Sequence, residues 1–434
     1  MRDSAAVRSD LLKGHARTDG HRLRAVALLM ALVFVMSLGY GAGAPLLPLY
    51  VKQFVGAAAP AALAWHVGAV GGAYTFALFM FAPLWGRVSD RRGRNIALAW
   101  GFGIFLVGGL ASAVAPNLAA VYAARLLAGA GAAAVMPAAQ AYIADFSDPV
   151  ARSRRFVLLG SASFVGFLAG PLVGNWLAGP VMNVPVGMMP AMVDWPWLAV
   201  AAVGLPVLVL VPLWIKPQPS TVRASLPAAT SAVRARFVRA SMLLAGFASF
   251  ATGTFEVGFN LFGGQTLGLA SGTIAIMFVT CSVAMLAAQA TLLLPFVRRR
   301  IDGRWMASVF VFSALALLFI SVVPNAGSFI LFIGVVGASV GMIGPVLSYE
   351  LLDRGSSAHG ALLGKQAAAG NLGQAVGSVA AGWLFAWQPA APFWAAALVL
   401  AIGAIASVFL WGTARADELA RESGQPRQND RQVL

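Results

Sequence analysis

The sequence predicts an all-α membrane protein in which twelve transmembrane helices form two pseudo-symmetric bundles of six. Three observations support this fold class. The chain has 434 residues and is 59% hydrophobic but only 10% charged, whereas roughly a quarter of the residues of a soluble domain are charged. Apolar runs of about 18 residues or more, long enough to cross a bilayer, recur from end to end. Basic residues and several other residues also repeat in a pattern that divides the chain into two halves.

The composition excludes several classes of protein. A net charge of +15 suggests nucleic acid in a soluble protein, but in a membrane protein basic residues collect in cytoplasmic segments as orientation signals. The one cysteine, Cys281, permits no disulfide framework or cysteine-based metal site, and the four histidines lack metal-ligand spacing. No phosphate-binding loop of the G-x-x-x-x-G-K-[ST] type occurs, so the sequence does not support ATP-driven transport.

The predicted domains follow the apolar runs. Residues 1–24 are polar and basic and lack a small-residue cleavage site, so we expect a cytoplasmic tail before an uncleaved span. A six-helix bundle is predicted over 25–215, with spans at 25–49, 64–85, 96–115, 118–143, 156–178 and 195–215. A cytoplasmic linker at 216–239 leads to a second bundle at 240–411, with spans at 237–262, 272–296, 305–323, 326–349, 358–385 and 390–411. A second cytoplasmic tail is predicted at 412–434.

The basic residues predict the orientation. With this span count and a cytoplasmic N-terminus, all but two of the 30 Lys and Arg residues fall in cytoplasmic segments. The exceptions are Lys52, assigned outside, and Arg125, assigned to the fourth span. One missed span would reverse every later segment, so the asymmetry predicts a multi-pass protein of the cytoplasmic (inner) membrane with both termini inside.

The two halves carry the same residues at corresponding positions. These pairs are Pro137 and Pro345, Asp145 and Asp353, Gly174 and Gly382, and Gly93-Arg94 and Gly303-Arg304. Two six-span halves joined by a cytoplasmic linker are typical of transporters built from repeats around a site near the bilayer midplane.

The segment Gly86–Asn95, GRVSDRRGRN, carries four arginines, one aspartate and two glycines between two apolar spans. Each charge at the bilayer centre costs roughly 2.5–3.5 kcal/mol, so we expect a loop at a membrane surface. The positive-inside rule places this loop on the cytoplasmic side.

Several motifs resemble those of the major facilitator superfamily, and the resemblance extends over nearly the whole chain, 25–411. Gly86–Asn95 is similar to the family signature G-x-L-a-D-r-x-G-r-k, with Val88 in place of the usual Leu. RLLAGAGAA from Arg125 resembles the Arg-x-x-x-Gly motif of the fourth span. GFLAGPLVG, Gly166–Gly174, resembles the G-x-x-x-G-P-x-x-G pattern of the drug:proton antiporter branch, as does GYGAGAPLLPLY in the first span.

The resemblance implies a cytoplasmic gate formed by Gly86, Asp90, Arg91, Gly93, Arg94 and Asp145. Asp90 is implied to meet the positive end of a helix near Ser356–Gly360, an interaction worth about 0.3–1 kcal/mol, and Arg94 to pair with Asp145. Such a latch would be made in one state and broken in the other. The alternative is a topogenic charge cluster that only anchors the segment; the aspartate among the arginines favours the latch.

In the fifth span, Gly166, Gly170 and Gly174 are four apart, share one helix face and allow another helix to approach closely. Pro171 removes one backbone hydrogen bond and is expected to kink the span. Ordinary packing and a specific gating role are both consistent with this pattern.

Two charged residues at membrane depth are candidates for proton coupling. Arg125 is expected to face a bundle interior or cavity, although residues 25–49 lack the carboxylate that many family members carry there. Glu256 tends to stay protonated away from water, so it could take and release a proton as its exposure changes. Structural alternatives are an Arg125 bonded to backbone carbonyls and a Glu256 bonded to a neighbouring helix.

Polar and aromatic residues in the spans that form this family's central ring are candidates for the substrate cavity. They are Tyr40, Tyr74, Gln140, Asn260, Gln265, Gln289, Asn371 and Gln374, with Met136, Phe259 and Phe262 as apolar wall. A largely apolar pocket with few hydrogen-bonding groups suits amphipathic or weakly cationic organic molecules better than phosphates or sugar acids.

These features predict a secondary active transporter that exports a small organic compound, a drug or a metabolite, by proton antiport with alternating access. The expected partners are the small-molecule substrate, protons and the lipid bilayer, with no nucleic acid, no cofactor beyond the proton gradient, and a monomeric state. The alternatives are a proton-coupled importer and a non-transporting scaffold or sensor on the same fold. An enzyme is not expected, because no His cluster or Ser/His/Asp set occurs at membrane depth.

Overall fold

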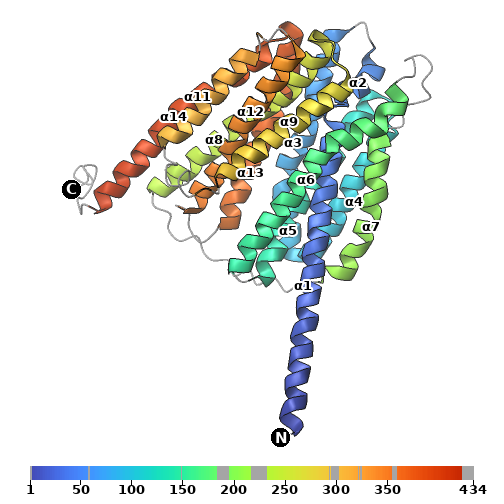
Figure 1. Cartoon of the computed structure of the whole chain (residues 1–434), viewed down its shortest axis with the longest axis vertical. Helices are drawn as coiled ribbons and strands as arrows, with labels where there is room; N and C mark the ends of the chain where they lie inside the picture. The colour runs from blue at the N-terminus through green and yellow to red at the C-terminus, as the bar shows by residue number, and fades with distance from the viewer. Residues whose placement is uncertain are drawn as a thin grey trace. The chain divides into compact units, whose positions relative to one another are not determined.

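The computed structural model describes residues 2–422 except 57–58, 148, 183–194, 217–231, 293, 295–302, 321, 323–324 and 354–358. Each predicted span lies on a long helix (Figure 1). In the first half these helices are α1 (Arg2–Gly43), α3 (Pro60–Arg92), α4 (Arg94–Ala113), α5 (Leu118–Phe146), α6 (Pro149–Met182) and α7 (Trp195–Trp214). In the second half they are α8 (Ala232–Leu261), α9 (Ser271–Thr291), α11 (Gly303–Ile320), α12 (Ala326–Asp353), α13 (His359–Trp387) and α14 (Ala391–Glu422).

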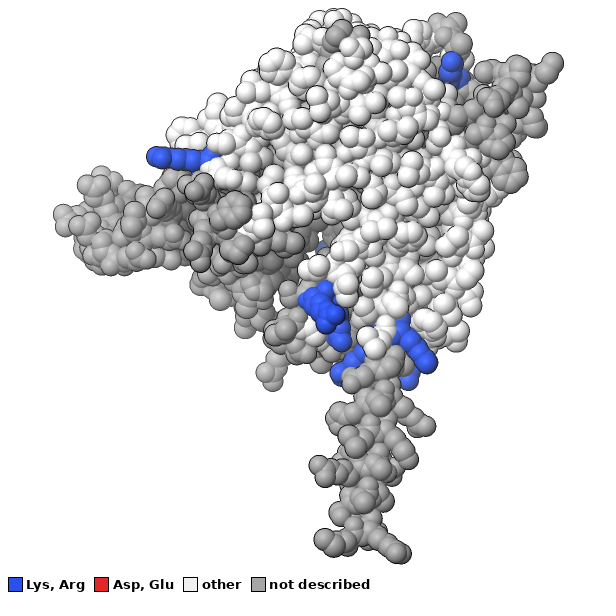
Figure 2. All heavy atoms as spheres, viewed as in Figure 1, with Lys and Arg blue, Asp and Glu red and all other residues white. Residues whose placement is uncertain are grey.

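The surface of these helices is suited to lipid. Ten of the described helices are long and apolar enough to cross a membrane, and a shorter apolar helix covers Arg304–Ile320. Large apolar side chains are exposed, including Trp176 (77% exposed) and Trp387 (76%). Figure 2 shows a broad uncharged surface with Lys and Arg at its edges. Soluble monomers rarely expose apolar patches larger than a few hundred Å², so these helices cross a membrane.

The chain packs as two compact units: unit 1 is Met1–Leu46 with Met80–Val222, and unit 2 is Leu47–Phe79 with Arg223–Leu434. Helix pairs in unit 1 have counterparts in unit 2. They are α1–α6 and α8–α13, α4–α5 and α11–α12, α4–α7 and α11–α14, and α1–α7 and α8–α14. Pro137 lies inside α5 and Pro345 inside its counterpart α12. The sequence repeat is therefore also a repeat of helix packing.

Residues Leu47–Phe79 pack with unit 2, although the predicted first bundle contains them. Glycines on α3 and α13 allow this contact. A Cβ at Gly68 would lie 2.4 Å from the Ser378 carbonyl oxygen, and one at Gly382 would lie 2.4 Å from the Ala64 carbonyl oxygen. Since such distances are far below van der Waals contact, only glycine lets the two backbones approach this closely.

Several predicted boundaries are wrong. The first span was expected to run to residue 49, but α1 ends at Gly43 and the short helix α2 (Leu47–Val55) follows. Pro45 explains the break, because proline lacks the N–H of the helical hydrogen bond and its ring clashes with the preceding turn. The linker was expected to run to residue 239, but α8 begins at Ala232; the predicted tail at 1–24 is part of α1, which begins at Arg2. Hydropathy marks where a helix enters lipid and does not mark where it begins or ends.

Candidate functional site

The segment Gly86–Asn95 is helical and not the predicted loop. Helix α3 continues to Arg92, α4 begins at Arg94, and Gly93 alone separates them. Gly93 adopts φ 104° and ψ 153°, a region that is essentially restricted to glycine. A loop was expected because charged residues avoid lipid. A helix that extends beyond the bilayer places them in water just as a loop does. Arg91 and Arg92 in the last turn also favour the helix, since they complement its negative end.

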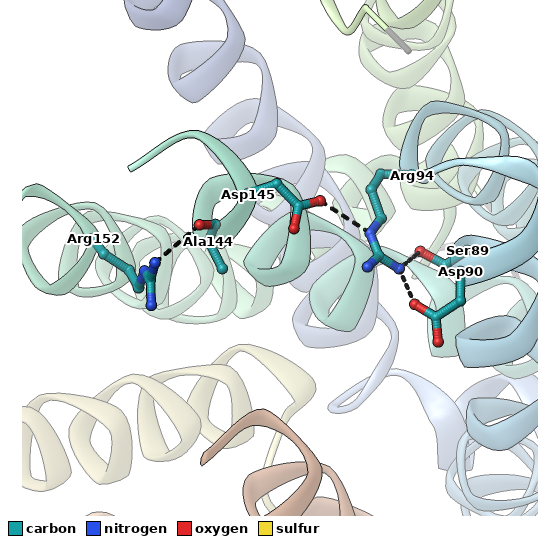
Figure 3. Close-up of polar contacts among 6 residues, drawn as sticks. All are labelled: Ser89, Asp90, Arg94, Ala144, Asp145 and Arg152. Carbon is teal, nitrogen blue, oxygen red and sulfur yellow. Dashed lines mark hydrogen bonds and ion pairs between the residues drawn. The ribbon is translucent and has the colours of Figure 1, made fainter. Parts of the chain in front are cut away.

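Arg94 connects α3, α4 and α5 through its guanidinium (Figure 3). Its Nη1 donates to the Ser89 hydroxyl at 3.0 Å and ion-pairs with Asp90, and its Nε donates to Asp145 Oδ2 at 3.3 Å. The side chains of Arg94 and Asp145 are 7% and 11% exposed, whereas that of Asp90 is 59% exposed. The Arg94–Asp145 pair implied by the family resemblance is therefore present. It is the buried part of the network.

Asp90 has Arg94 as its ion-pair partner within unit 1, four residues along the chain and across the break at Gly93. The partner implied by the resemblance, at Ser356–Gly360, begins outside the residues that the structure describes. Arg91 is exposed to solvent. Gly86 lies within α3, and a Cβ added to it would meet no atom within 4 Å.

Two further residues at this end of unit 1, Ser89 and Arg152, were not predicted to act here. Ser89 is 4% exposed and accepts from Arg94. Arg152 on α6 donates through Nη2 to the carbonyl oxygen of Ala144 at 3.1 Å (Figure 3) and to that of Ser147 at 3.2 Å. A basic side chain commonly satisfies the last carbonyls of a helix. The run ARSRR directly after α5 was an available signal for Arg152, whereas nothing distinguished Ser89.

Replacing Gly93 with alanine is expected to lower the free energy of unfolding by about 1–3 kcal/mol, because its φ and ψ are strained for any other residue. The added Cβ would also lie 2.9 Å from Asn95 Oδ1. Thermal unfolding of the purified protein measures this. The matched control is Gly86→Ala, where a Cβ meets nothing within 4 Å. Equal stability of the two variants would contradict the proposed strain.

The three glycines of the fifth span form the contact between α6 and α1. A Cβ would lie 2.3 Å from Phe34 O at Gly166, 2.6 Å from Gly41 C at Gly170, and 2.4 Å from Ala42 O at Gly174. The close helix approach expected of these residues is therefore observed. Ser37 and Ser163 add a hydroxyl–hydroxyl contact of 2.7 Å across the same pair. Pro171 lies in the same turn as Gly170, and α6 continues through it.

Replacing Gly170 with alanine is expected to destabilise the protein by about 1–3 kcal/mol, because the added methyl group overpacks two backbones in contact. Gly160→Ala on the same helix is the control, since its Cβ would meet nothing within 4 Å. Thermal unfolding of both variants tests the prediction, and a Gly170→Ala protein as stable as the control would refute it.

Glu256 lies on α8 in unit 2 and contacts α13. Its Oε2 accepts from Gln374 Nε2 at 3.3 Å, and the glutamate is partly exposed. Directly before Gln374 on α13, Gly373 lies where a Cβ would be 2.2 Å from Gly246 O. Two residues before Glu256 on α8, Thr254 Oγ1 donates to Gly377 O at 3.1 Å. The carboxyl group therefore lies in a tight helix pair that is the counterpart of α1–α6.

Arg125 on α5 is 6% exposed, as expected of a residue facing the bundle interior. Its guanidinium carbon lies 5.6 Å from the ring centroid of Trp197 on α7, within cation–π distance. Among the described residues no carboxylate forms an ion pair with it. Trp197 was not predicted, because no sequence pattern distinguishes it from other aromatic residues at a span end.

The predicted cavity residues divide between the two units. Tyr40, Met136 and Gln140 belong to unit 1, and the others to unit 2. Phe259 packs against Phe278 at 4.6 Å between ring centroids, and Phe262 against Phe329 at 5.4 Å. Gln289 donates to Gly341 O at 3.0 Å. Tyr74, Asn260 and both phenylalanines are buried, while Asn371 and Gln374 are partly exposed on α13.

A family model described as Major Facilitator Superfamily matches residues 29–356. The chain belongs to this superfamily. The match includes the Arg94 network, the Arg125 motif, the α6 glycines and Glu256. The superfamily consists of membrane transporters, so this chain is a multi-pass transport protein for small molecules and not an enzyme.

Named members of the superfamily are similar over most or part of the chain. Multidrug resistance protein 2 of Bacillus subtilis strain 168 is 22% identical over 405 residues, which cover 91% of this chain and 96% of that protein. Tetracycline resistance protein, class C, of Escherichia coli is 32% identical over 162 residues, 37% of this chain and 40% of that protein. The crystal structure of a D-xylose-proton symporter matches with a TM-score of 0.69 at 16% identity, covering 89% and 97% of the two chains. This last likeness shows the superfamily fold alone.

Proposed function

We propose that this transporter exports a small organic compound across the cytoplasmic membrane in exchange for protons, with both termini in the cytoplasm. The names of two relatives, a multidrug resistance protein and a tetracycline resistance protein, support efflux of organic compounds. The distribution of Lys and Arg supports the orientation.

The observation that carries the proposal is Glu256, a carboxyl group in the last two turns of α8 that accepts a hydrogen bond from Gln374 of α13. Protons from the outside neutralise Glu256, the two halves of the protein rearrange, and the proton leaves to the cytoplasm as substrate binds. A carboxyl group suits this role because desolvation favours its neutral form and hydration its charged form. Loss of the proton therefore depends on which side of the membrane the residue faces.

The Arg94 network serves as the cytoplasmic gate in this proposal. Asp145 and Ser89 hold Arg94 within unit 1, which leaves the largely exposed carboxylate of Asp90 available for a second partner. A latch at this end closes the cytoplasmic side in one state and opens in the other.

Everted membrane vesicles that contain the protein test the function. An imposed proton gradient is expected to drive ethidium into these vesicles, and a protonophore is expected to stop the uptake. Right-side-out vesicles distinguish export from import. Proton-driven accumulation in right-side-out vesicles would identify an importer, and transport of no compound in either orientation would favour a non-transporting scaffold or sensor.

A further inference from the structure

Arg125 is a buried cation whose polar atoms are not all satisfied. Its Nε is buried and has no hydrogen-bond partner in the described part of the chain. The side chain is 6% exposed. A charged group at this depth normally pairs with an acid or binds a ligand, because an uncompensated buried charge is costly.

Trp197 presents a second unsatisfied donor beside it. The residue is 2% exposed, and its indole Nε1 is buried without a hydrogen-bond partner among the described residues. Phe105 packs on the ring at 5.7 Å, and a Cβ at Gly109 would lie 2.3 Å from its Cε3 atom. The indole is therefore held in place, so its N–H cannot turn to find another acceptor.

Gly43 brings the end of α1 against both side chains. The point at which a Cβ of Gly43 would lie is 3.1 Å from Arg125 Nη2, 3.5 Å from Arg125 Nη1 and 3.7 Å from Trp197 Nε1. Outside α1, the nearest atoms to this point are thus nitrogen donors of these two side chains. Two buried donors that no described residue satisfies favour an anion, and a guanidinium beside an N–H suits the two oxygens of a carboxylate.

We propose that Arg125, Trp197 and Gly43 form a subsite for one singly charged anionic group, the carboxylate of the transported compound. This inference rests on the proposed transport function. It extends the expected substrates from weakly cationic molecules to amphipathic molecules that carry a carboxylate. One guanidinium supplies one positive charge, and α1 ends at Gly43 with its partially negative carbonyl end, so a dianion is disfavoured. A few residues after Gly43, between Leu46 and Leu47, the chain passes from unit 1 into unit 2.

Anion binding to the purified full-length protein tests the subsite without any gradient. Benzoate is expected to raise the thermal unfolding midpoint in a concentration-dependent way, whereas benzamide, its neutral analogue, is not. Trp197→Phe keeps the ring but removes the N–H, and is expected to weaken benzoate binding roughly ten-fold. The matched control is Trp100→Phe, at a tryptophan that is 67% exposed in the same unit. Arg125→Gln is expected to abolish binding, and Gly43→Ala to block it.

A parallel titration with chloride in sulfate buffer distinguishes the two sources of a monovalent anion. Chloride protection that competes with benzoate and needs the Trp197 N–H supports the subsite and identifies a free ion as an occupant. Equal protection by benzoate and benzamide, no protection by benzoate, or equal affinity of the Trp197→Phe and Trp100→Phe variants would overturn the proposal. Because the assay needs no transport, benzoate binding in a protein that exports nothing would refute only the proposed function.

Discussion

The Glu256→Gln variant is expected to lose proton-driven export while the protein still folds and inserts. Glutamine keeps a side-chain oxygen that can accept from Gln374 Nε2, which now donates to Glu256 Oε2 at 3.3 Å. The α8–α13 packing, which depends on glycine contacts and on the Thr254–Gly377 hydrogen bond, is left intact. The change therefore removes only the group that titrates.

Everted vesicles provide the measurement. Ethidium uptake driven by a proton gradient is expected to fall to the level of vesicles without the protein, while exchange of labelled for unlabelled ethidium without a gradient continues. Glu256→Asp keeps a titratable group and is expected to retain part of the gradient-driven activity. Normal gradient-driven transport by Glu256→Gln would exclude Glu256 from proton coupling.

The Asp90→Ala variant is expected to slow transport about two- to five-fold, since losing a helix-end interaction worth about 0.3–1 kcal/mol shifts the ratio of two states by that factor. Its effect on stability is expected to be small. The Asp90 side chain is 59% exposed, and an exposed ion pair such as that with Arg94 contributes about 0.2–1 kcal/mol. Arg94 also keeps its bonds to Asp145 and Ser89.

The control for this experiment is Arg87→Ala, which removes an exposed charge from the same helix about one turn earlier. A latch predicts that transport depends on Asp90 and much less on Arg87, at equal amounts of inserted protein. A topogenic anchor depends on positive charge, so it predicts the reverse order. Measuring transport and membrane insertion for both variants decides between the two.

Much of the fold could be predicted from residues that act locally. Long apolar runs indicated the helices, and the paired prolines Pro137 and Pro345 indicated the repeat that the helix packing shows. The spacing of Gly166, Gly170 and Gly174 predicted a close helix contact, because residues four apart share a face whatever helix they meet. The charge pattern of Gly86–Asn95 indicated where the Arg94 network lies, but the predicted loop is wrong because the segment is helical except at Gly93.

Partners could not be predicted in the same way. Arg125 was recognised as a buried charge without an acid, yet Trp197 beneath it comes from a helix distant in the sequence. Ser89 resembles many other polar residues in the sequence, and only the structure shows that its hydroxyl accepts from Arg94. Such contacts depend on how helices rotate and cross, and hydropathy does not encode either property.

The sequence by itself determined that the chain crosses the membrane repeatedly, that its halves are repeats, and where its few intramembrane charges lie. Each of these follows from the cost of placing polar groups in lipid, which acts on every segment separately. Only the tertiary structure decided that α1 ends at Gly43 beside Arg125 and Trp197, that Arg94 binds Asp145, and that Leu47–Phe79 packs with unit 2. The last of these depends on backbones that approach within contact distance at glycines of α3 and α13. The other two depend on how helices rotate and cross, which hydropathy does not encode.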